Sequence, residues 1–545
     1  MDRRLALALL LSGLAVVVSS MLFPPAPRRP APSTAVSDSS RVIAAEPPPS
    51  VATPQEVPGS STPSLGIRAD TITVETQRVV YEFSTLGAAP VGVTLRDYKA
   101  LNTDSGSVQL VRDSAALVSF HLVSGSDTVA LDQAVFSVVA ATSPSTDSVV
   151  FHAPTTVGPV RLVYHLDDEG YLLRVNGEVP VNIRELVITI PRGLRSEEAN
   201  IEDDRRYLAF AVKPVRDDAR SIDFSKLDSA ERRIETGPFT WVASKNKYFL
   251  VSLLTPAANG SPFSRAHLVG APRSEGPATT ADAHVVLPVE NGRFSLEIYA
   301  GPQEWRRLRA LGRDMEHANP YGGFMKGVVQ PFATIVMRAL LWMHDKLRLS
   351  YGWVLVIFGI AVRIILWPLN HRAMRSSLKM QAIQPEMAAI QKKYRNNPQK
   401  QQEEMVRIYR EHGMSPFSMF SGCLPMLIPM PVLFALFFVF QNTIEFRGVS
   451  FLWLADISLK DPYYLLPLIM GASMYVLSWI GMRNAPPNPQ AKMMMYMFPV
   501  IMTVALLNMA GGLNLYYAVQ NIAALPQQWL IARERARQTA LPTRR

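Results

Sequence analysis

Arg363 is the residue whose type and position most clearly predict chemistry. It is the one charged side chain in an apolar run from Tyr351 to Asn370. The 22 residues between Arg348 and His371 would form a helix of about 33 Å, which is long enough to cross a bilayer core. Arg363 lies eight residues before His371, about 12 Å along that helix, too deep for its guanidinium to reach the surface easily. An arginine buried at that depth costs at least ~2.5 kcal/mol, so the sequence predicts a compensating group or a function.

The other long apolar stretches offer no acidic partner for this arginine. Residues 415–444, 463–482 and 493–532 contain no Asp, Glu, Lys or Arg. An internal ion pair within the membrane is therefore disfavoured, and a hydrated pocket that an acidic group of a partner could enter is favoured. The alternative is an arginine at the edge of such a pocket that donates to backbone carbonyls where the bilayer thins.

Motifs for other chemistry were not found. The chain has no H-E-x-x-H, G-x-S-x-G or phosphate-loop pattern, and its histidines in the long middle region are scattered. The single cysteine, Cys423, excludes disulfides and cysteine-based metal sites within one chain. We therefore expect no enzyme, no cofactor and no metal site. An anchored sugar-modifying enzyme stays a weak alternative because concave sandwiches can bind sugars.

Composition places Arg363 within a membrane protein that carries a large insert. The chain has 545 residues, of which 48% are hydrophobic, and its apolar runs lie near the two ends. The net charge of +10 comes largely from basic residues beside apolar runs, so it indicates topology rather than nucleic-acid binding.

Residues 1–23 are predicted to be a retained signal anchor, with a cleavable signal peptide as the alternative. Residues 24–64 contain 11 prolines and are predicted to be an extended linker.

A β-rich domain and an amphipathic helix are predicted between the linker and the Arg363 helix. Between 65 and 302, short runs such as TITVET, LVITI and RFSLEIY alternate apolar and polar residues, which is typical of an antiparallel β-sandwich. This domain is expected outside the membrane. Within 303–349, apolar residues at helical spacing predict a helix in the outer interface, or alternatively a linker helix packed on the sandwich. The predicted stripe comprises Val328, Phe332, Ile335, Val336, Ala339 and Met343.

The region after Asn370 sets the predicted topology. Residues 371–413 carry nine Lys or Arg and four Glu, a net charge of +5, which places them in the cytoplasm. Their apolar spacing predicts a coiled-coil hairpin, either a docking arm or a solvated hairpin that only fixes topology. The run 493–532 is broken at 508–512 and should form two helices, followed by a basic tail at 533–545. These patterns predict six transmembrane helices with both termini cytoplasmic.

Five ordered motifs in the C-terminal half resemble the YidC membrane protein insertases. They are the arginine helix ending in WPLN, the basic MxxxQPEM hairpin, GCLPMLIPMP, DPYYLLPLIMG and GGLNLYYAVQN. The resemblance is close over about 350–532 and looser over the predicted sandwich. It implies a five-helix core around a hydrophilic groove that is open to the cytoplasm and to lipid.

The same resemblance suggests which residues contact substrate. Arg363 matches the groove arginine of the family, and Tyr516 and Tyr517 match the tyrosine pair of its last helix. Gly359 stands where many members have a hydroxyl residue, and Pro429 stands where they commonly have Gln. The groove should therefore depend more on Arg363, Tyr517 and Ser421.

The implied function is that of a membrane protein insertase and chaperone in the bacterial inner membrane. Its partners would be nascent membrane proteins, the lipid bilayer, the Sec translocon and the ribosome, with no other nucleic-acid contact. A secondary transporter that binds an anionic solute at Arg363 is the alternative, but such transporters usually show internal repeats, and this sequence shows none.

Overall fold

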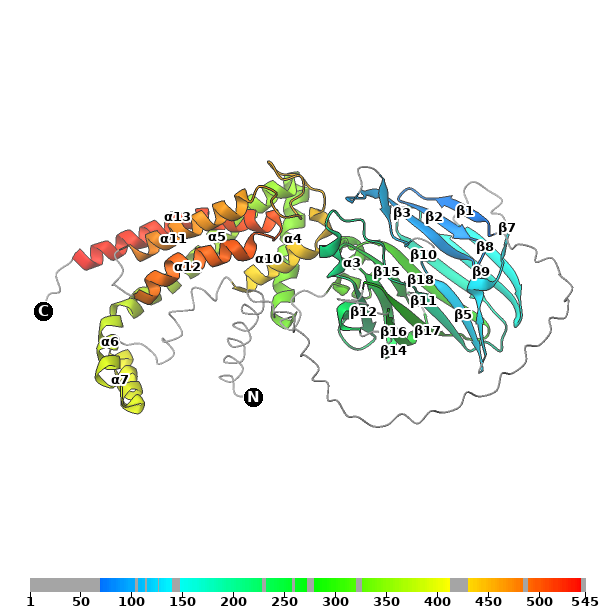
Figure 1. Cartoon of the computed structure of the whole chain (residues 1–545), viewed down its shortest axis with the longest axis horizontal. Coiled ribbons are helices and arrows are strands. Elements are labelled where there is room, and N and C mark those ends of the chain that lie inside the picture. The colour runs from blue at the N-terminus through cyan, green and yellow to red at the C-terminus, as the bar shows by residue number, and fades with distance from the viewer. Residues whose placement is uncertain are drawn as a thin grey trace, which may run out of the picture. The chain divides into compact units, whose positions relative to one another are not determined.

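The computed structural model describes residues 69–540, except 103–105, 113–114, 126, 140–147, 228–231, 257–259, 272–278, 320–325, 412–429 and 484–488. The predicted anchor at 1–23, the linker at 24–64, and Ser421, Cys423 and Pro429 lie outside the described residues. Within the described part, a β-rich domain is followed by a helical region (Figure 1). This order confirms the coarse fold expected from the sequence.

The β-rich domain contains two antiparallel sheets. A four-stranded sheet has the order β1-β2-β3-β4, and a larger sheet runs β6-β5-β11-β17-β16-β14-β15-β18-β10-β9-β8-β7, with β12 and β13 joined to it through β14. The strands are β1 (Thr71–Glu75), β2 (Val79–Ser84), β3 (Ala89–Lys99), β4 (Ser107–Gln109), β5 (Ser119–Ser124), β6 (Asp127–Ala130), β7 (Ser137–Val139), β8 (Ser148–Thr155), β9 (Gly158–Leu166), β10 (Leu172–Glu178), β11 (Glu185–Ile190), β12 (Ala209–Pro214), β13 (Arg220–Asp223), β14 (Arg232–Lys245), β15 (Phe249–Leu254), β16 (Phe263–Gly270), β17 (Ala281–Pro288) and β18 (Arg293–Pro302).

Aromatic side chains from the two sheets pack together in the core of this domain. Phe83 of β2 lies 4.9 Å from Tyr164 of β9 and 5.9 Å from Phe151 of β8, measured between ring centroids. The hydroxyl of Tyr164 donates to the carbonyl of Ala88 at 2.6 Å, so this buried polar group is satisfied. Buried and exposed residues alternate along β9 and β10, as the period of two in the sequence predicts.

The helical region begins after β18. Its helices are α3 (Trp305–Ala310), α4 (Lys326–Leu347), α5 (Tyr351–Ala382), α6 (Gln384–Lys393), α7 (Pro398–Glu411), α10 (Met430–Asn442), α11 (Leu465–Met482), α12 (Pro489–Leu506) and α13 (Gly511–Ala540). One short helix, α2 (Ile201–Arg205), lies within the β-rich domain. Helix α13 packs against α5 and α11, α12 packs against α11, and α4 packs against α10 and α5.

The helix that carries Arg363 starts where the apolar run starts but continues beyond it. Helix α5 runs unbroken through Pro368 to Ala382, so the predicted span and the beginning of the basic hairpin form one helix. A second helix, α11, ends at Met482 as expected, and the predicted break between the last two helices falls at residues 507–510.

Length and apolarity alone identify few membrane-spanning helices in the described part of the chain. Leu465–Met482 is long and apolar enough to cross a membrane, and Val329–Leu347 with Tyr351–Ile365 passes the same test as a pair bent by 119°. The expected third span is described only from Met430 onward, as α10. The full set of six transmembrane helices remains a prediction.

Helix α4 buries a different stripe from the one that the sequence indicated. Val336 and Met343 are buried, but Phe332 and Ile335 are exposed, at 39% and 64%. The buried side chains are Val329, Ala333, Val336, Met337, Leu340, Leu341 and Met343. Because a stripe chosen from spacing has no absolute direction, only the packing against α10 and α5 decides which face is covered.

The basic region after α5 forms two packed helices. Ile383, Ile408 and Tyr409 are buried together, and Met387 and Ile390 of α6 pack against them. Apolar side chains at the start of α6 and along it therefore pack with those of α7.

Candidate functional site

The candidate site lies where α5 faces α13. On α5, Gly359, Arg363 and Trp367 are four residues apart and therefore share one side of the helix. On α13, Gln520 and Gln527 are seven residues apart and share another. These two sides face each other. The glutamines of α13 bond to the Arg363 side chain and to backbone carbonyls of α5, so the contact contains hydrogen-bonding groups as well as apolar side chains.

Arg363 is held by a neutral side chain. Its Nη2 donates to Oε1 of Gln527 at 2.8 Å, and Nε2 of Gln527 donates to the carbonyl of Trp367 at 3.3 Å. Gln527 is buried, with 1% of its surface exposed, and Nε of Arg363 has no hydrogen-bond partner among the described residues. The described residues also provide no ion pair to Arg363. Its charge is therefore oriented by an amide but not neutralised.

A second glutamine joins the helices about two turns away. Nε2 of Gln520 donates to the carbonyl of Gly359 at 2.7 Å and to the hydroxyl of Tyr516 at 3.0 Å. Gly359 is the point of closest approach, since a Cβ atom there would lie 3.1 Å from Cγ1 of Val519. The residue that replaces the family's hydroxyl group is thus packed against α13, and the polarity at this level comes from Gln520 instead.

The tyrosine pair lies beside this contact. Tyr516 is buried against Phe358, with ring centroids 6.1 Å apart, and its ring is 5.7 Å from that of Tyr517. Tyr517 is half-buried and packs at the border of the helical core. The structure therefore brings together four of the five predicted site residues, namely Arg363, Gly359, Tyr516 and Tyr517. The fifth, Ser421, is outside the described residues.

Sequence reasoning missed the amide side chains of α13. Besides Gln520 and Gln527, the amide of Asn521 donates to the carbonyl of Met470 and to Oγ of Ser473 on α11, both at 3.3 Å. The amide of the fully buried Asn514 donates to the carbonyl of Leu506 at 3.0 Å. Six amide side chains within the apolar run 493–532 were the available signal, but amides carry no charge and so do not stand out in a charge pattern.

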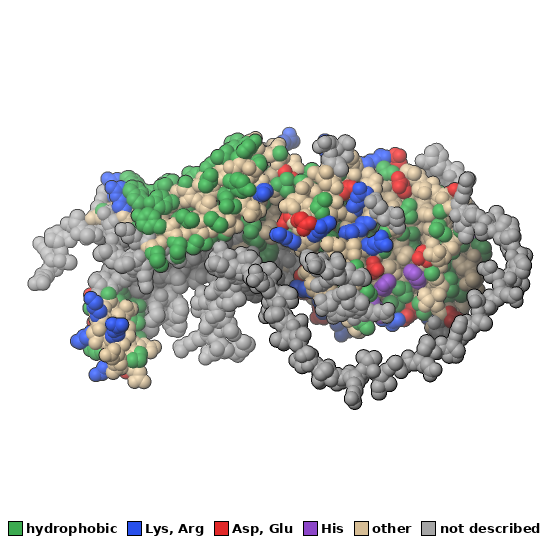
Figure 2. Space-filling view, viewed as in Figure 1, with side chains coloured by type: hydrophobic (Ala, Val, Ile, Leu, Met, Phe, Trp, Pro, Cys, Tyr) green, Lys and Arg blue, Asp and Glu red, His purple; other side chains and the backbone are tan. Residues whose placement is uncertain are grey.

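Large apolar side chains cover the surface of the helices around the site. Green side chains gather over α11, α12 and α13 in Figure 2. On α5, Ile364 and Ile365 directly follow Arg363 and are 65% and 72% exposed. Other exposed residues are Leu468, Val476, Trp479, Val500, Val504, Ile522, Trp529 and Leu530. Apolar surface of this extent is rare on a soluble monomer and is suited to contact with lipid chains.

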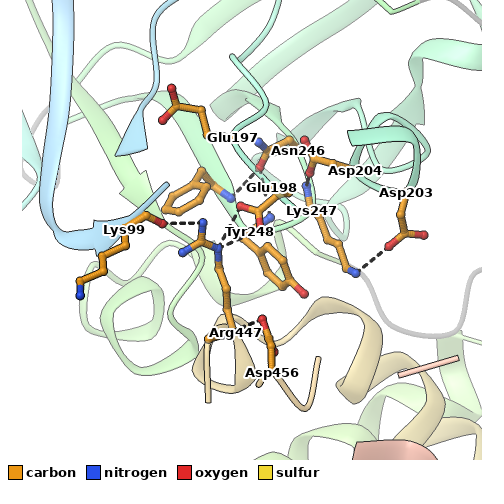
Figure 3. A network of polar contacts seen from close by, with 12 residues as sticks. Lys99, Glu197, Glu198, Asp203, Asp204, Asn246, Lys247, Tyr248, Arg447 and Asp456 are labelled. Carbon is orange, nitrogen blue, oxygen red and sulfur yellow. Dashed lines mark hydrogen bonds and ion pairs between the residues drawn. The ribbon is translucent and has the colours of Figure 1, made fainter. Parts of the chain in front are cut away.

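The loop between α10 and α11 contacts the β-rich domain through a buried ion pair (Figure 3). Nε of Arg447 is 2.9 Å from both carboxylate oxygens of Glu198, and its Nη2 donates to the carbonyl of Lys99 at 2.9 Å. The side chains of Arg447 and Glu198 are 5% and 7% exposed. A pair buried this well attaches the loop to the domain, because either charge left alone would be costly to bury.

Two carboxyl groups have raised pKa values, Glu198 in this ion pair and Glu445, which contacts α3. Burial raises the pKa of Glu198 to about 6, although the neighbouring Arg447 acts in the opposite direction. Burial also raises the pKa of Glu445 to about 7; Glu304 raises it further, and Arg306 and the backbone N–H groups lower it. One oxygen of Glu445 accepts from the backbone N–H of Trp305 at 3.3 Å, and the other is buried without a partner among the described residues.

Comparison with known proteins gives consistent matches along the chain. The family described as 60Kd inner membrane protein matches residues 342–538, and the YidC periplasmic domain matches residues 71–335. The membrane protein insertase YidC of Prosthecochloris aestuarii is 29% identical over 565 residues, covering 97% of this chain and 94% of that protein. The protein of the same name from Chlorobium luteolum is 30% identical over 434 residues, covering 76% and 70%. A crystal structure of an active YidC insertase with its first transmembrane domain resolved aligns with 85% of this chain and 93% of that chain, at 21% identity and a TM-score of 0.34.

Proposed function

Because this chain belongs to the YidC family of membrane protein insertases, we propose that it receives polar or acidic tails of nascent membrane proteins beside Arg363. The hydrophobic segment of the substrate would then move into lipid along the neighbouring helices. Six transmembrane helices, with both termini in the cytoplasm, would surround a groove open to the cytoplasm. In this topology the β-rich domain would be periplasmic and residues 371–413 cytoplasmic.

The observation that carries the proposal is that Arg363 is held in place but its charge is not neutralised. Its guanidinium is positioned by Gln527, yet its charge has no carboxylate among the described residues. The adjacent Ile364 and Ile365 are exposed and apolar. An uncompensated positive charge beside a lipid-facing surface can attract an acidic tail and release the apolar segment that follows it.

Non-covalent interactions and the membrane potential would supply enough free energy for insertion without covalent chemistry. A close carboxylate–guanidinium pair gains up to ~4 kcal/mol at an effective dielectric constant of about 20. Transfer of the apolar segment into lipid contributes ~25 cal/mol per Å² of buried apolar surface. A membrane potential, positive outside, adds ~2.3 kcal/mol per 100 mV for each acidic charge that moves outward. No nucleotide or cofactor is required.

The proposed partners follow from the same function. Nascent membrane proteins are the substrates, and the basic segment 371–413, which includes α6 and α7, is a candidate for contacts with the ribosome or the substrate. The Sec translocon would be a partner for larger substrates. The names of the relatives favour an insertase over an anion transporter.

A reconstitution experiment tests the proposal against the transporter. Proteoliposomes that contain the purified full chain would be given a short single-span protein with an acidic tail, and protease protection of the tail would be measured. Insertion above that of empty liposomes is expected. Parallel liposomes would be tested for uptake of a small anion such as sulfate. Anion uptake without insertion would overturn the proposal.

A further inference from the structure

A pocket in the β-rich domain, remote in sequence from the helices, is lined by arginines. Its volume is about 810 Å³, which is in the usual range for small-molecule sites. Its described lining is formed by Arg112, Arg192, Arg195, Ser196, Ile201, Arg205, Leu208, Val269, Gly270, Ala271, Thr280 and Asp282. These residues come from the segment after β4, the segment from β11 to α2, and the facing ends of β16 and β17. The pocket is thus assembled by the tertiary fold.

The described lining of this pocket carries more positive than negative side chains. Four arginines stand against one carboxylate, that of Asp282, among the described lining residues. Asp282 is already engaged, because its Oδ1 accepts from the backbone N–H of Arg192 at 2.7 Å. Arg195 pairs with Glu197 at 3.0 Å, and Arg205 pairs with Glu202 at 2.6 Å.

Two of the arginines have no carboxylate partner. Nε and Nη2 of Arg112 donate to the carbonyls of Leu194 and Thr279, both at 3.1 Å, which fixes the guanidinium without neutralising it. The pKa of Arg112 is lowered, first by burial and then by the charges of Arg205 and Arg192, whereas Asp204 acts in the opposite direction. Neither Arg112 nor Arg192 forms an ion pair with a described residue. Both line the same pocket, so an anion bound there would offset their positive charge.

The pocket is too large and too mixed in character for a bare inorganic ion. Ile201, Leu208 and Val269 contribute apolar surface beside the arginines. Such a lining suits an organic molecule whose apolar or neutral part contacts these side chains while its anionic group lies among the guanidinium groups. Several arginines that converge on one point match a phosphate, which offers more acceptors and more charge than a carboxylate.

We infer that this pocket binds a small organic phosphate ester, with Arg112 and Arg192 as the main contacts to the phosphate. The ester could be a free phosphorylated molecule or the headgroup of a phospholipid, since both present the same group to the arginines. This site is separate from Arg363 and does not depend on the insertion mechanism proposed for the helices.

Isothermal titration calorimetry on the full chain in phosphatidylcholine nanodiscs would test this assignment. The probes are glucose, glucuronate and glucose 6-phosphate, which share a ring and differ in charge. Glucose 6-phosphate is expected to bind saturably, at least tenfold more tightly than glucuronate, with no measurable binding of glucose. Binding should weaken as the salt concentration rises. Dihexanoyl phosphatidylglycerol provides the lipid arm: tighter binding of this lipid than of glucose 6-phosphate would identify a headgroup as the source, and weaker binding a free phosphorylated molecule.

Two variants make the result specific to the pocket. Arg192→Gln should weaken binding of glucose 6-phosphate by about tenfold, because it removes a charged donor from an exposed side chain that supports no other described side chain. Arg161→Gln, on β9 and outside the pocket, should change binding by less than twofold. The inference is wrong if none of the phosphate probes binds, if glucuronate binds as tightly as the phosphate, or if Arg192→Gln binds like the unmodified protein.

Discussion

The contact between Arg363 and Gln527 sets the chemistry of the candidate site at the scale of single residues. An amide oxygen stabilises the orientation of a guanidinium at small electrostatic cost, because the amide carries no net charge. The Nε atom of Arg363 is buried without a partner among the described residues, so the hydrogen-bonding capacity of the guanidinium is not filled. A carboxylate at position 527 would have made the same hydrogen bond and would also have cancelled the charge.

Substitution of Arg363 tests whether its charge acts on the substrate. Arg363→Lys should keep much of the insertion activity because it retains the charge, whereas Arg363→Ala should lose more. The defect of Arg363→Ala should grow by about tenfold for each acidic residue in the translocated tail, as each carboxylate loses its attraction to the site. Otherwise identical substrates with zero, one or two acidic residues would be compared in proteoliposomes.

The stability of these variants has to be measured beside their activity. If the guanidinium only connects α5 to α13, both variants should lower the thermal unfolding temperature, and the activity defect should be independent of tail charge. That pattern would make Arg363 a structural residue rather than a substrate contact.

Gln527→Glu separates charge from packing at the same position. The two side chains have nearly the same shape, and the new carboxylate would pair with Arg363. It could no longer donate to the carbonyl of Trp367, but the charge-assisted bond to the guanidinium should offset that loss, so α5 and α13 should stay packed. Insertion of substrates with acidic tails should fall by about tenfold or more, while the unfolding temperature should not fall. The matched control is Gln528→Glu, since Gln528 lies close to Gly481 of α11 rather than Arg363. Equal defects in the two variants would contradict the charge model.

At the scale of elements, the helical core depends on a close approach at the start of α5. A Cβ atom on Gly352 would lie 2.1 Å from Cδ2 of Phe451. Phe451 is buried and packs edge-to-face on Trp353, with ring centroids 5.4 Å apart, so it has little room to move. The glycine therefore allows the loop after α10 to pack directly on α5.

Gly352→Ala should destabilise the protein by about 1–3 kcal/mol because the added methyl group overpacks this contact. Gly327→Ala is the matched control, since a Cβ atom there meets no atom within 4 Å in the described structure. Alanine at that position of α4 should be neutral or stabilising by up to about 1 kcal/mol. Thermal unfolding in detergent, followed by tryptophan fluorescence, compares the two. A lower unfolding temperature for Gly327→Ala than for Gly352→Ala would refute this account.

At the scale of the whole molecule, the contact between the α10–α11 loop and α3, the helix that follows the β-rich domain in the chain, should depend on pH. Because burial raises the pKa of Glu445 from 4.5 to about 7, the native state binds the proton more tightly than the unfolded state. The stabilisation is complete below about pH 4.5 and is lost as the pH rises through 7. Each unit of raised pKa corresponds to about 1.4 kcal/mol, so the total is on the order of 3–4 kcal/mol.

Glu445→Gln should remove this pH dependence. The amide keeps an oxygen that can accept from the N–H of Trp305 but no longer ionises. The variant should gain unfolding temperature relative to the unmodified protein at pH 8 and show little gain at pH 5. Glu403→Gln, on the exposed surface of α7, should show no pH-dependent difference. A gain for Glu445→Gln that is equal at both pH values would contradict the assignment.

The proposed topology can be tested with two single-cysteine proteins. With Cys423→Ser as background, Ser105→Cys should be labelled by an impermeant maleimide added outside intact cells, and Gln401→Cys should not. Permeabilised cells provide the control for reactivity, because both cysteines should then be labelled. Equal labelling of the two in intact cells would rule out a periplasmic β-rich domain together with a cytoplasmic α6–α7 region.

The sequence by itself determined the elements and the charged residue on which the proposed function depends. Apolar runs indicate the positions of α5, α11, α12 and α13, because burial is read along a continuous stretch of chain, although α5 and α13 continue into the basic segments that follow. Alternation specified the strands of the β-rich domain for the same reason. Arg363 was evident because a charge within a long apolar run is costly and therefore unusual.

Only the tertiary structure decided which side chains meet. Gln527 is 164 positions from Arg363, and Glu198 is 249 positions from Arg447, so no local pattern links either pair. The arginine pocket likewise joins segments near 112, 192–205 and 269–282. These contacts depend on the rotation of each helix about its axis and on strand register across the sheets. The hydrophobic period gives the spacing of a face but not the neighbour that covers it, as the exposed Phe332 and Ile335 of α4 demonstrate.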